Sequence, residues 1–431
     1  MKVRIRIFIG IGCTILMLAS WIVTVNAQTT AEKQLELIAQ AAYLMNDGIY
    51  IRAVTLLEEA AGYSDEFTLE AERKLKQAYL ALIDNRGFGR RYTTLLERQI
   101  NRHNHSPDMF EELANYYLSI SRTAQALNVL KAGLERTGCQ ILIAMYEDSR
   151  YAFETSRSSY DYVSAIYNGT VRVRRDGLWG IANSQGTIII PCAYDKISTF
   201  CTDRAVVKRD GEIFAVDRNN NRIALLRNGA EDFGNLANNR ISIRVDGVWR
   251  RATGDFSLGS AEFEQIGMYA DGYAAAKTGG RWGVIDLGMN WLVPPIYDGI
   301  IMDELGRCFG QGAVFVKSEG AVYLVVENQI VGVYEDARPF SNEGFAAVKN
   351  DGRWGFINTN GEVMIDFIFD DALSFGQHLA AVKIGELWGY ISIGGAVVID
   401  VQFIEAKSFS GGSAPVLTER GWSFITLLEY K

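Results

Sequence analysis

The C-terminal part of the chain repeats one pattern, in which a Trp-Gly strand lies between two turns. Each unit holds a short apolar strand, a polar or Gly-bearing turn, the Trp-Gly strand, a second turn and a β-branched strand. Turn signals this close together between apolar runs indicate antiparallel hairpins. The clearest copies are residues 171–195, 274–298, 346–370 and 380–405.

Six tryptophans mark this strand, and Ile213 and Val322 take the same place in two further units. The eight anchors are 34, 36, 33, 40, 32, 34 and 34 residues apart, which predicts about eight units of one structure. We interpret the tryptophans as structural anchors of the repeat. They are Trp179, Trp249, Trp282, Trp354, Trp388 and Trp422.

A basic and an acidic residue also recur in register with the anchors. The base precedes the anchor by five residues in seven units: Arg174, Lys208, Arg244, Lys277, Lys317, Lys349 and Lys383. The acid usually precedes it by 18: Asp161, Asp195, Glu231, Glu264, Asp298, Asp336, Asp370 and Glu405. A row of cations could bind an anionic polymer or carboxylates. Alternatively, each base pairs with a repeated acid or a Trp face, and the equal number of acids favours this structural interpretation.

These residues resemble the WG-repeat family, which is named for Trp-Gly in units of this length. The resemblance is weaker where the glycine is replaced, at Phe214, Arg250, Tyr323 and Ser423. Together with the helical and N-terminal segments described below, it resembles multidomain bacterial surface proteins. The resemblance implies no chemistry for individual residues.

The two ends of the array favour a closed ring. The last unit stops at Lys431 after two strands, and a stray acid-bearing segment, residues 160–164, precedes the first unit. The first piece could supply what the last unit lacks, and closure would remove exposed strand edges. An open β-solenoid with an incomplete terminal cap is the alternative.

Residues 31–155 show helical periodicity with few breakers. The segment 48–58 recurs at 87–97, and a third copy starts at Ser121. The order Leu113-Ala114, Tyr117, Ser121, Ala126 and Leu130 resembles the tetratricopeptide repeat. The resemblance implies antiparallel helix pairs, with residues 139–155 as a closing helix.

The N-terminus predicts export. Lys2, Arg4 and Arg6 precede an uncharged apolar run from Ile7 to Val25, which fits either a cleaved signal peptide or an uncleaved membrane anchor. In both cases we expect residues 28–431 to lie outside the cytoplasm. The glycine content also changes along the chain, with 8 glycines in residues 1–155 and 34 in residues 156–431.

Composition excludes several functions. A net charge of −8 argues against a nucleic-acid binder, and 3 His and 5 Cys argue against a zinc protein or a disulfide-dense scaffold. No P-loop and no Gly-x-Ser-x-Gly elbow is present. We therefore predict no metal, no cofactor and no catalytic residues, and we leave a Cys192–Cys201 disulfide open.

One insertion departs from the repeat. Residues 299–313 are longer than their counterparts, and an extra tryptophan, Trp291, precedes them. Loop insertions on a rigid ring often carry ligand contacts. Trp291, Asp303, Glu304 and Arg307 are therefore the predicted ligand surface.

The predicted architecture is an α+β multidomain chain. Residues 1–27 are a signal peptide or signal anchor, 28–155 a tetratricopeptide-like α-helical domain, and 156–431 an all-β array of about eight three-stranded units. The predicted function is an extracytoplasmic, non-catalytic scaffold, membrane-anchored or secreted, that binds a protein or an envelope polymer. The alternative is an extracytoplasmic carbohydrate-active enzyme with a carboxylate pair on the ring.

Overall fold

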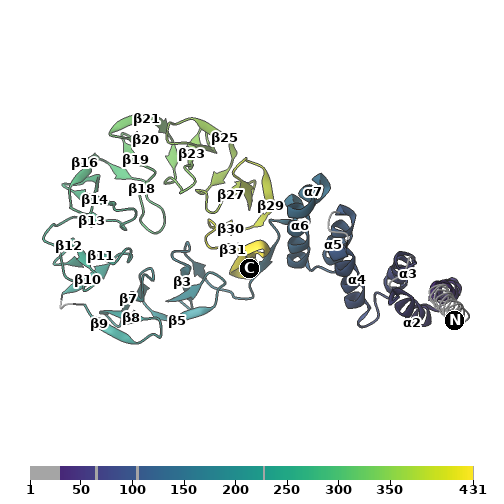
Figure 1. The fold of residues 1–431 in the computed structure, drawn as a ribbon. Helices are drawn as coiled ribbons and strands as arrows, with labels where there is room; N and C mark the ends of the chain where they lie inside the picture. Colours follow the sequence, from purple (N-terminus) through teal and green to yellow (C-terminus); the bar gives the residue numbers. More distant parts are fainter. Residues whose placement is uncertain (1–29, 64–66, 103–105, 227–228, 431) are drawn as a thin grey trace, which may run out of the picture. The chain divides into compact units, whose positions relative to one another are not determined.

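The computed structural model describes residues 30–63, 67–102, 106–226 and 229–430 (Figure 1). The predicted signal or anchor at residues 1–27 lies outside this range. Among the helices of the described residues, none combines the length and the apolar character that crossing a membrane requires. The chain divides into two compact units, Met1–Ser149 and Arg150–Lys431.

The first unit consists of consecutive helices, as the periodicity predicts. Residues 30–46 form a helix, followed by α2 (Tyr50–Ala61), α3 (Thr68–Ala81), α4 (Phe88–Arg102), α5 (Pro107–Ser119), α6 (Thr123–Thr137) and α7 (Gln140–Ser149). Small side chains let neighbouring helices approach closely. At Gly133 of α6, an added Cβ would lie 2.8 Å from Leu142 of α7 and 2.9 Å from Phe110 of α5. The closing helix ends at Ser149, before the predicted position 155.

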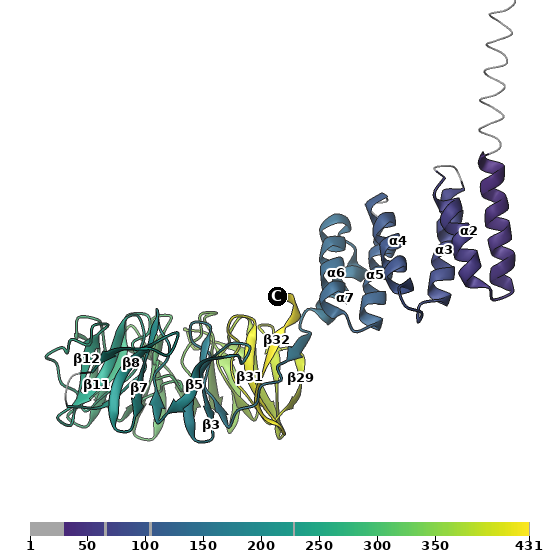
Figure 2. The same cartoon turned by 90° about the horizontal axis from the view of Figure 1, so that it is seen from below.

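The second unit is a ring of eight β-sheets, the blades of a propeller (Figures 1 and 2). Blade 1 contains β2 (Tyr162–Val163), β3 (Thr170–Arg175), β4 (Leu178–Asn183) and β5 (Ile188–Tyr194), and blade 2 contains β6 (Lys196–Ile197), β7 (Arg204–Arg209), β8 (Glu212–Asp217) and β9 (Arg222–Leu225). Blade 3 contains β10 (Ala230–Phe233), β11 (Arg240–Val245) and β12 (Val248–Thr253). Blade 4 contains β13 (Gln265–Ile266), β14 (Ala274–Thr278), β15 (Arg281–Ile285) and β16 (Trp291–Tyr297).

Blade 5 contains β17 (Gly299–Ile300), β18 (Phe309–Gly310), β19 (Ala313–Ser318), β20 (Ala321–Val326) and β21 (Gln329–Tyr334), and blade 6 contains β22 (Asp336–Ala337), β23 (Ala346–Asn350), β24 (Arg353–Ile357) and β25 (Val363–Phe369). Blade 7 contains β26 (Asp371–Ala372), β27 (Leu379–Ile384), β28 (Leu387–Ser392) and β29 (Val397–Phe403). Blade 8 contains β30 (Glu405–Ala406), β31 (Ser413–Thr418), β32 (Gly421–Leu427) and β1 (Phe153–Thr155). The favoured closed ring of eight units is confirmed, and the open solenoid is wrong.

The prediction of three-stranded units is wrong for most blades. The acid-bearing segment forms an additional short strand at the inner edge, two residues long in seven of the eight blades. Two residues are too few to show the alternation of apolar and polar side chains that reveals a strand. Each long outer strand runs on into the inner strand of the next blade, with one residue between them, as at Asp195 between β5 and β6.

Both ends of the array build blade 8, as the incomplete units predict. β1 pairs with β32 in the register Phe153↔Leu427 and Thr155↔Ile425, and Tyr160 bridges Trp422 further along. Tyr194 lies opposite Trp179 in the same way in blade 1. Residues 153–160 therefore supply the outer strand that the C-terminal unit lacks.

The glycine of Trp-Gly makes room for a bulge in the outer strand. In blade 7, Trp388 lies opposite Phe403 while Tyr390 lies opposite Ile399, so the outer strand carries extra residues here. An added Cβ on Gly389 would lie 2.5 Å from the carbonyl oxygen of Ile399. The bulged backbone therefore leaves room for the hydrogen of a glycine at this position and no room for a side chain.

We predict that Gly389→Ala destabilises the protein by about 1–3 kcal/mol, because the new methyl group overpacks against backbone that cannot move aside. Gly394→Ala is the matched control in the same blade. Its Cβ would meet only the Ser392 hydroxyl oxygen, at 3.9 Å, and the change should stay within about 0.5 kcal/mol. Urea unfolding of both variants measures the difference, and equal stabilities would contradict the role given to Gly389.

Candidate functional site

The repeated bases lie directly across the hairpin from the anchors. Arg174 faces Trp179 and Lys277 faces Trp282, and all seven bases show this register, including those opposite Ile213 and Val322. In the eighth unit Leu417 lies opposite Trp422 instead. A spacing of five residues therefore corresponds to cross-strand neighbours joined by a two-residue turn.

Most of these bases have a partner within the ring. Three form ion pairs with the acids: Arg244 with Glu231 at 3.2 Å, Lys277 with Glu264 at 3.8 Å and Lys349 with Glu335 at 4.0 Å. Arg174 lies over the Trp179 ring, with its guanidinium carbon 5.6 Å from the ring centroid, and Lys208 donates a hydrogen bond to the Glu231 carbonyl. Lys383 pairs with the Glu386 carboxylate at 3.9 Å, and the side chain of Lys317 lies against Gly299. These contacts favour the structural interpretation of the repeated bases over a row of cations free to bind an anionic polymer.

The repeated acids also have a second task, which the sequence did not reveal. In six blades the carboxylate accepts a hydrogen bond from a backbone N–H in the turn between the two central strands. The donors and acceptors are Asp210 to Asp195, Gly247 to Glu231, Gly280 to Glu264, Glu319 to Asp298, Gly352 to Glu335 and Gly385 to Asp370. In blade 6 this acid is Glu335, and the predicted Asp336 is the next residue, within β22.

The tryptophans pack against an aromatic residue of the outer strand. Trp354, Trp388 and Trp422 are buried, and their cross-strand partners are Phe369, Phe403 and Tyr160. Trp179, Trp249 and Trp282 are half-buried, opposite Tyr194, Phe263 and Tyr297.

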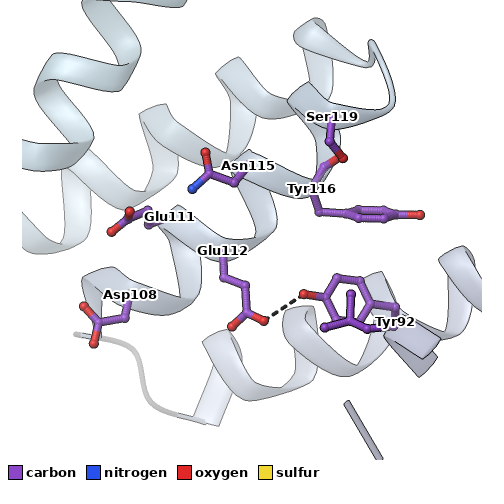
Figure 3. A pocket seen from close by; sticks show the side chains of 8 residues that line it. Tyr92, Asp108, Glu111, Glu112, Asn115, Tyr116 and Ser119 are labelled. Carbon is purple, nitrogen blue, oxygen red and sulfur yellow. Dashed lines mark hydrogen bonds between the residues drawn. The ribbon is translucent and has the colours of Figure 1, made fainter. Parts of the chain in front are cut away.

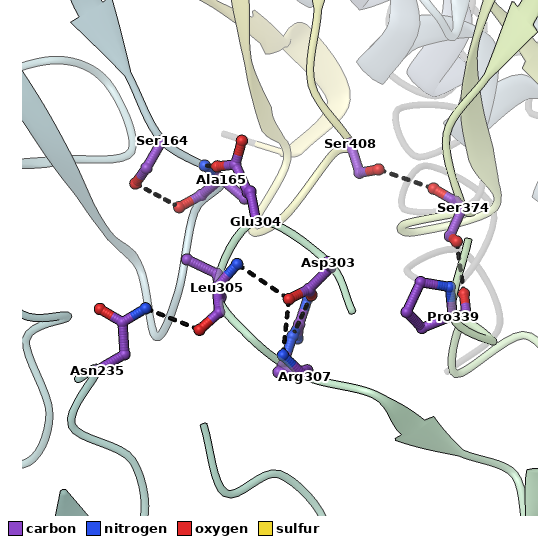
Figure 4. Close-up of polar contacts among 10 residues, drawn as sticks. All are labelled: Ser164, Ala165, Asn235, Asp303, Glu304, Leu305, Arg307, Pro339, Ser374 and Ser408. Atoms are coloured by element: carbon purple, nitrogen blue, oxygen red, sulfur yellow. Dashed lines mark hydrogen bonds and ion pairs between the residues drawn. The ribbon is translucent and has the colours of Figure 1, made fainter. Parts of the chain in front are cut away.

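The insertion of blade 5 reaches the centre of the ring and folds around Asp303 (Figure 4). The Asp303 carboxylate accepts hydrogen bonds from the backbone N–H groups of Leu305 and Arg307, both at 2.9 Å, and pairs with the Arg307 guanidinium at 2.6 Å. Leu305 is buried with Ala237 of blade 3 and Met268 of blade 4. The carbonyl of Leu305 accepts a hydrogen bond from the Asn235 amide at 2.7 Å. We call residues 302–307 the central loop.

Glu304 of the central loop binds both blades that meet at the ring closure. Its carboxylate accepts a hydrogen bond from the backbone N–H of Ala165 in blade 1 and pairs with the Lys407 ammonium of blade 8 at 2.7 Å. Burial lowers the pKa of Lys407, but Glu304, together with Tyr162 and Glu405, outweighs burial, so the net shift raises this pKa. Glu304 therefore ties the first blade to the last from across the ring.

Trp291 lies apart from the other three predicted ligand residues. It begins the outer strand β16, where its ring contacts Phe263 edge to face at 6.2 Å. The structure thus brings Asp303, Glu304 and Arg307 together and leaves Trp291 at the rim. The central loop contacts blades 1, 3, 4 and 8, of which blades 1, 3 and 8 lie far from it in the sequence.

Sequence reasoning missed a pocket of about 480 Å³ in the helical unit (Figure 3). Asp108, Glu111, Asn115 and Ser119 of α5 line it, together with Leu80, Tyr92, Glu112 and Tyr116. The spacing of three to four residues along α5 places this polar row on one face of the helix, which is the signal that could have found it.

Tyr92 and Glu112 form the floor of this pocket. The Tyr92 hydroxyl donates to Glu112 at 2.7 Å, and Lys76 pairs with the same carboxylate at 2.8 Å. Burial, and then the hydrogen bond to Glu112, raises the pKa of Tyr92, so the phenol remains a proton donor at neutral pH. The pocket can bind groups by charge and hydrogen bonds.

No metal site was predicted, and within the described ranges no group of three or more His, Cys, Asp or Glu is placed to hold a metal ion. Cys192 and Cys201 are free thiols, as are the other cysteines in the described part of the chain.

We predict that Glu304→Gln lowers the free energy of unfolding by about 1–3 kcal/mol, because it removes the closer of the two carboxylates that pair with the largely buried Lys407 ammonium and leaves only Glu405, at 3.4 Å. The raised pKa of Lys407 means that the pair stabilises the fold fully below pH 10.5 and loses this effect only as the pH rises further. Glu386→Gln, at an exposed ion pair, should change stability by about 0.5 kcal/mol or less. If both variants unfold at the same urea concentration, the role of Glu304 is wrong.

Comparisons with known proteins identify the repeat. The family model described as "WG containing repeat" matches residues 179–212, 260–282, 282–304, 330–354, 354–388 and 388–422. No curated protein matches the chain.

Solved structures similar to the chain include Kluyveromyces lactis Hsv2p, at 11% identity, with 53% of this chain and 92% of that chain covered and a TM-score of 0.38. The WD40 domain of SCAP from fission yeast is 8% identical, with 65% and 98% covered and a TM-score of 0.35. The Neurospora crassa Pan2 WD40 domain is 9% identical, with 53% and 88% covered and a TM-score of 0.31. The repeat model, the Trp register and the eight blades agree with one another, and the chain is a WG-repeat protein.

Proposed function

We propose that the protein is an extracytoplasmic, non-catalytic scaffold that holds a partner protein in the pocket of its helical unit. The observation that carries this proposal is the pocket itself, a hollow with a tyrosine–carboxylate floor and a row of polar side chains along α5. Helical repeats commonly present such hollows to extended or helical segments of other proteins.

The charge of the pocket indicates the chemistry of the partner. Asp108, Glu111 and Glu112 line it, and neither lysine nor arginine is among its lining residues. Lys76 neutralises Glu112, and Asp108 lies in the first turn of α5, where an acid stabilises the helix. Glu111 is therefore the carboxylate most available for a lysine or arginine of the partner.

One sequence feature supports the location, and the contacts of the acids support the scaffold role. The cations and apolar run at residues 1–27 favour export of the remainder of the chain. The enzyme alternative needs a carboxylate pair free for catalysis, whereas the repeated acids bind turn amides in six blades and the central-loop acids pair with Arg307 and Lys407. These uses favour a self-contained ring.

We predict that Glu111→Lys reduces recovery of the partner at least about tenfold when residues 28–431 are used as bait in an envelope extract. Glu135→Lys is the matched control, because it makes the same charge change on an exposed position of α6 outside the pocket. Quantitative mass spectrometry of the eluates measures recovery. Equal recovery by both variants, or recovery of glycan alone, would contradict the proposed pocket.

Fractionation of intact cells tests the location independently. We expect the protein in the membrane fraction, accessible to added protease once the envelope is opened, or in the medium if the N-terminal segment is cleaved. Protection of the protein within the cytoplasmic fraction would contradict the proposal.

A further inference from the structure

The outer strands of the ring have exposed edges, and most carry residues that oppose strand addition. Proline and charged side chains have this effect, because proline lacks an N–H and a charge would be buried by a new strand. Such residues are Pro191 on β5, Arg222 on the short β9, Pro294 and Pro295 on β16, Asp366 on β25, Asp400 on β29 and Glu154 on the short β1.

β21 is the exception among the outer strands of the described residues. Its sequence, Gln-Ile-Val-Gly-Val-Tyr, contains neither proline nor a charged residue. Ile330, Val331 and Val333 are 60%, 40% and 54% exposed. β21 pairs with β20 on one side, and no other described strand pairs with its opposite edge.

A cavity of about 530 Å³ adjoins the start of this strand. The turn Glu327–Asn328, which leads into β21, lines it together with Asp271 of blade 4. Its apolar wall includes Leu292 and the contacting rings of Tyr273 and Phe309, whose centroids are 4.5 Å apart. No lysine or arginine lines the cavity, so its two carboxylates make it suited to a cationic side chain.

We propose that β21 is a docking edge for an extended apolar segment of another protein, which adds as a further strand and places a lysine or arginine in the adjoining cavity. Backbone hydrogen bonds would supply affinity, and the cavity would supply specificity for the cation. Charge complementarity favours this occupant over a second copy of the chain, because two copies would bring Glu327 near the Glu335–Asp336 end of the partner strand. This edge is separate from the helical pocket, and neither proposal requires the other.

The test uses the full chain and a fluorescein-labelled peptide of sequence Arg-Val-Thr-Val-Thr-Val-Arg, with a counterpart in which glutamate replaces both arginines. Fluorescence anisotropy measures binding to the unaltered protein, to Ile330→Asp and to Val363→Asp. Val363 occupies in blade 6 the position of Ile330 in blade 5, and it is similarly exposed at 53%. Its strand already carries Asp366, so the second variant is a matched control.

We expect saturable binding of the arginine peptide, at least about tenfold weaker binding of the glutamate peptide, and a similar loss in Ile330→Asp with Val363→Asp unchanged. Slower amide exchange in β21 on addition of the peptide would support the same mode. Equal affinity for all three proteins, equal affinity for both peptides, or no saturable binding would overturn the proposal. Dimerisation in sedimentation that Ile330→Asp abolishes would assign the edge to a second copy and would also overturn it.

Discussion

The propeller depends on the pairing of β1 with β32, because this contact joins the two ends of the array. Without it, blade 8 would lack its outer strand. β32, an apolar strand that is now largely buried, would pair with β31 alone and present its other edge to solvent. Phe153 contributes to the same closure by packing into the cluster of Trp388, Phe403 and Leu427. A ring of similar blades thus becomes a single closed body through residues at the beginning of its sequence.

Within each blade, the repeated residues each solve one local problem. The tryptophan fills the space beside an aromatic residue of the outer strand, and the glycine after it leaves room for the bulged backbone of that strand. The acid satisfies an N–H of the hairpin turn and often a neighbouring base. The net negative charge of the array therefore reflects groups used within the fold. The helical pocket, the β21 edge and the cavity beside it are the surfaces whose polar groups and strand edge we propose to bind other molecules.

Much of this architecture follows from the sequence, since a repeat fixes both the number of blades and their register. The base five residues before each anchor corresponds to a cross-strand pair, and the incomplete last unit indicates closure. Other features depend on contacts that periodicity cannot reveal. Glu335 and Asp336 are adjacent acids, and only the turn opposite them distinguishes their roles. Glu304 binds Ala165 and Lys407, which are more than 100 residues away in the sequence. The composition of its loop does not reveal these partners, and for this reason the sequence predicted a ligand surface there.

The closure itself is tested most directly by hydrogen-exchange mass spectrometry of β32 in the full chain. If β1 covers this strand, residues Gly421–Leu427 exchange as slowly as the interior strand β24, and Phe153→Asp accelerates their exchange at least about tenfold. Rapid exchange of β32 in the unaltered protein, at the rate of an exposed edge strand such as β21, would contradict a ring closed by its two ends.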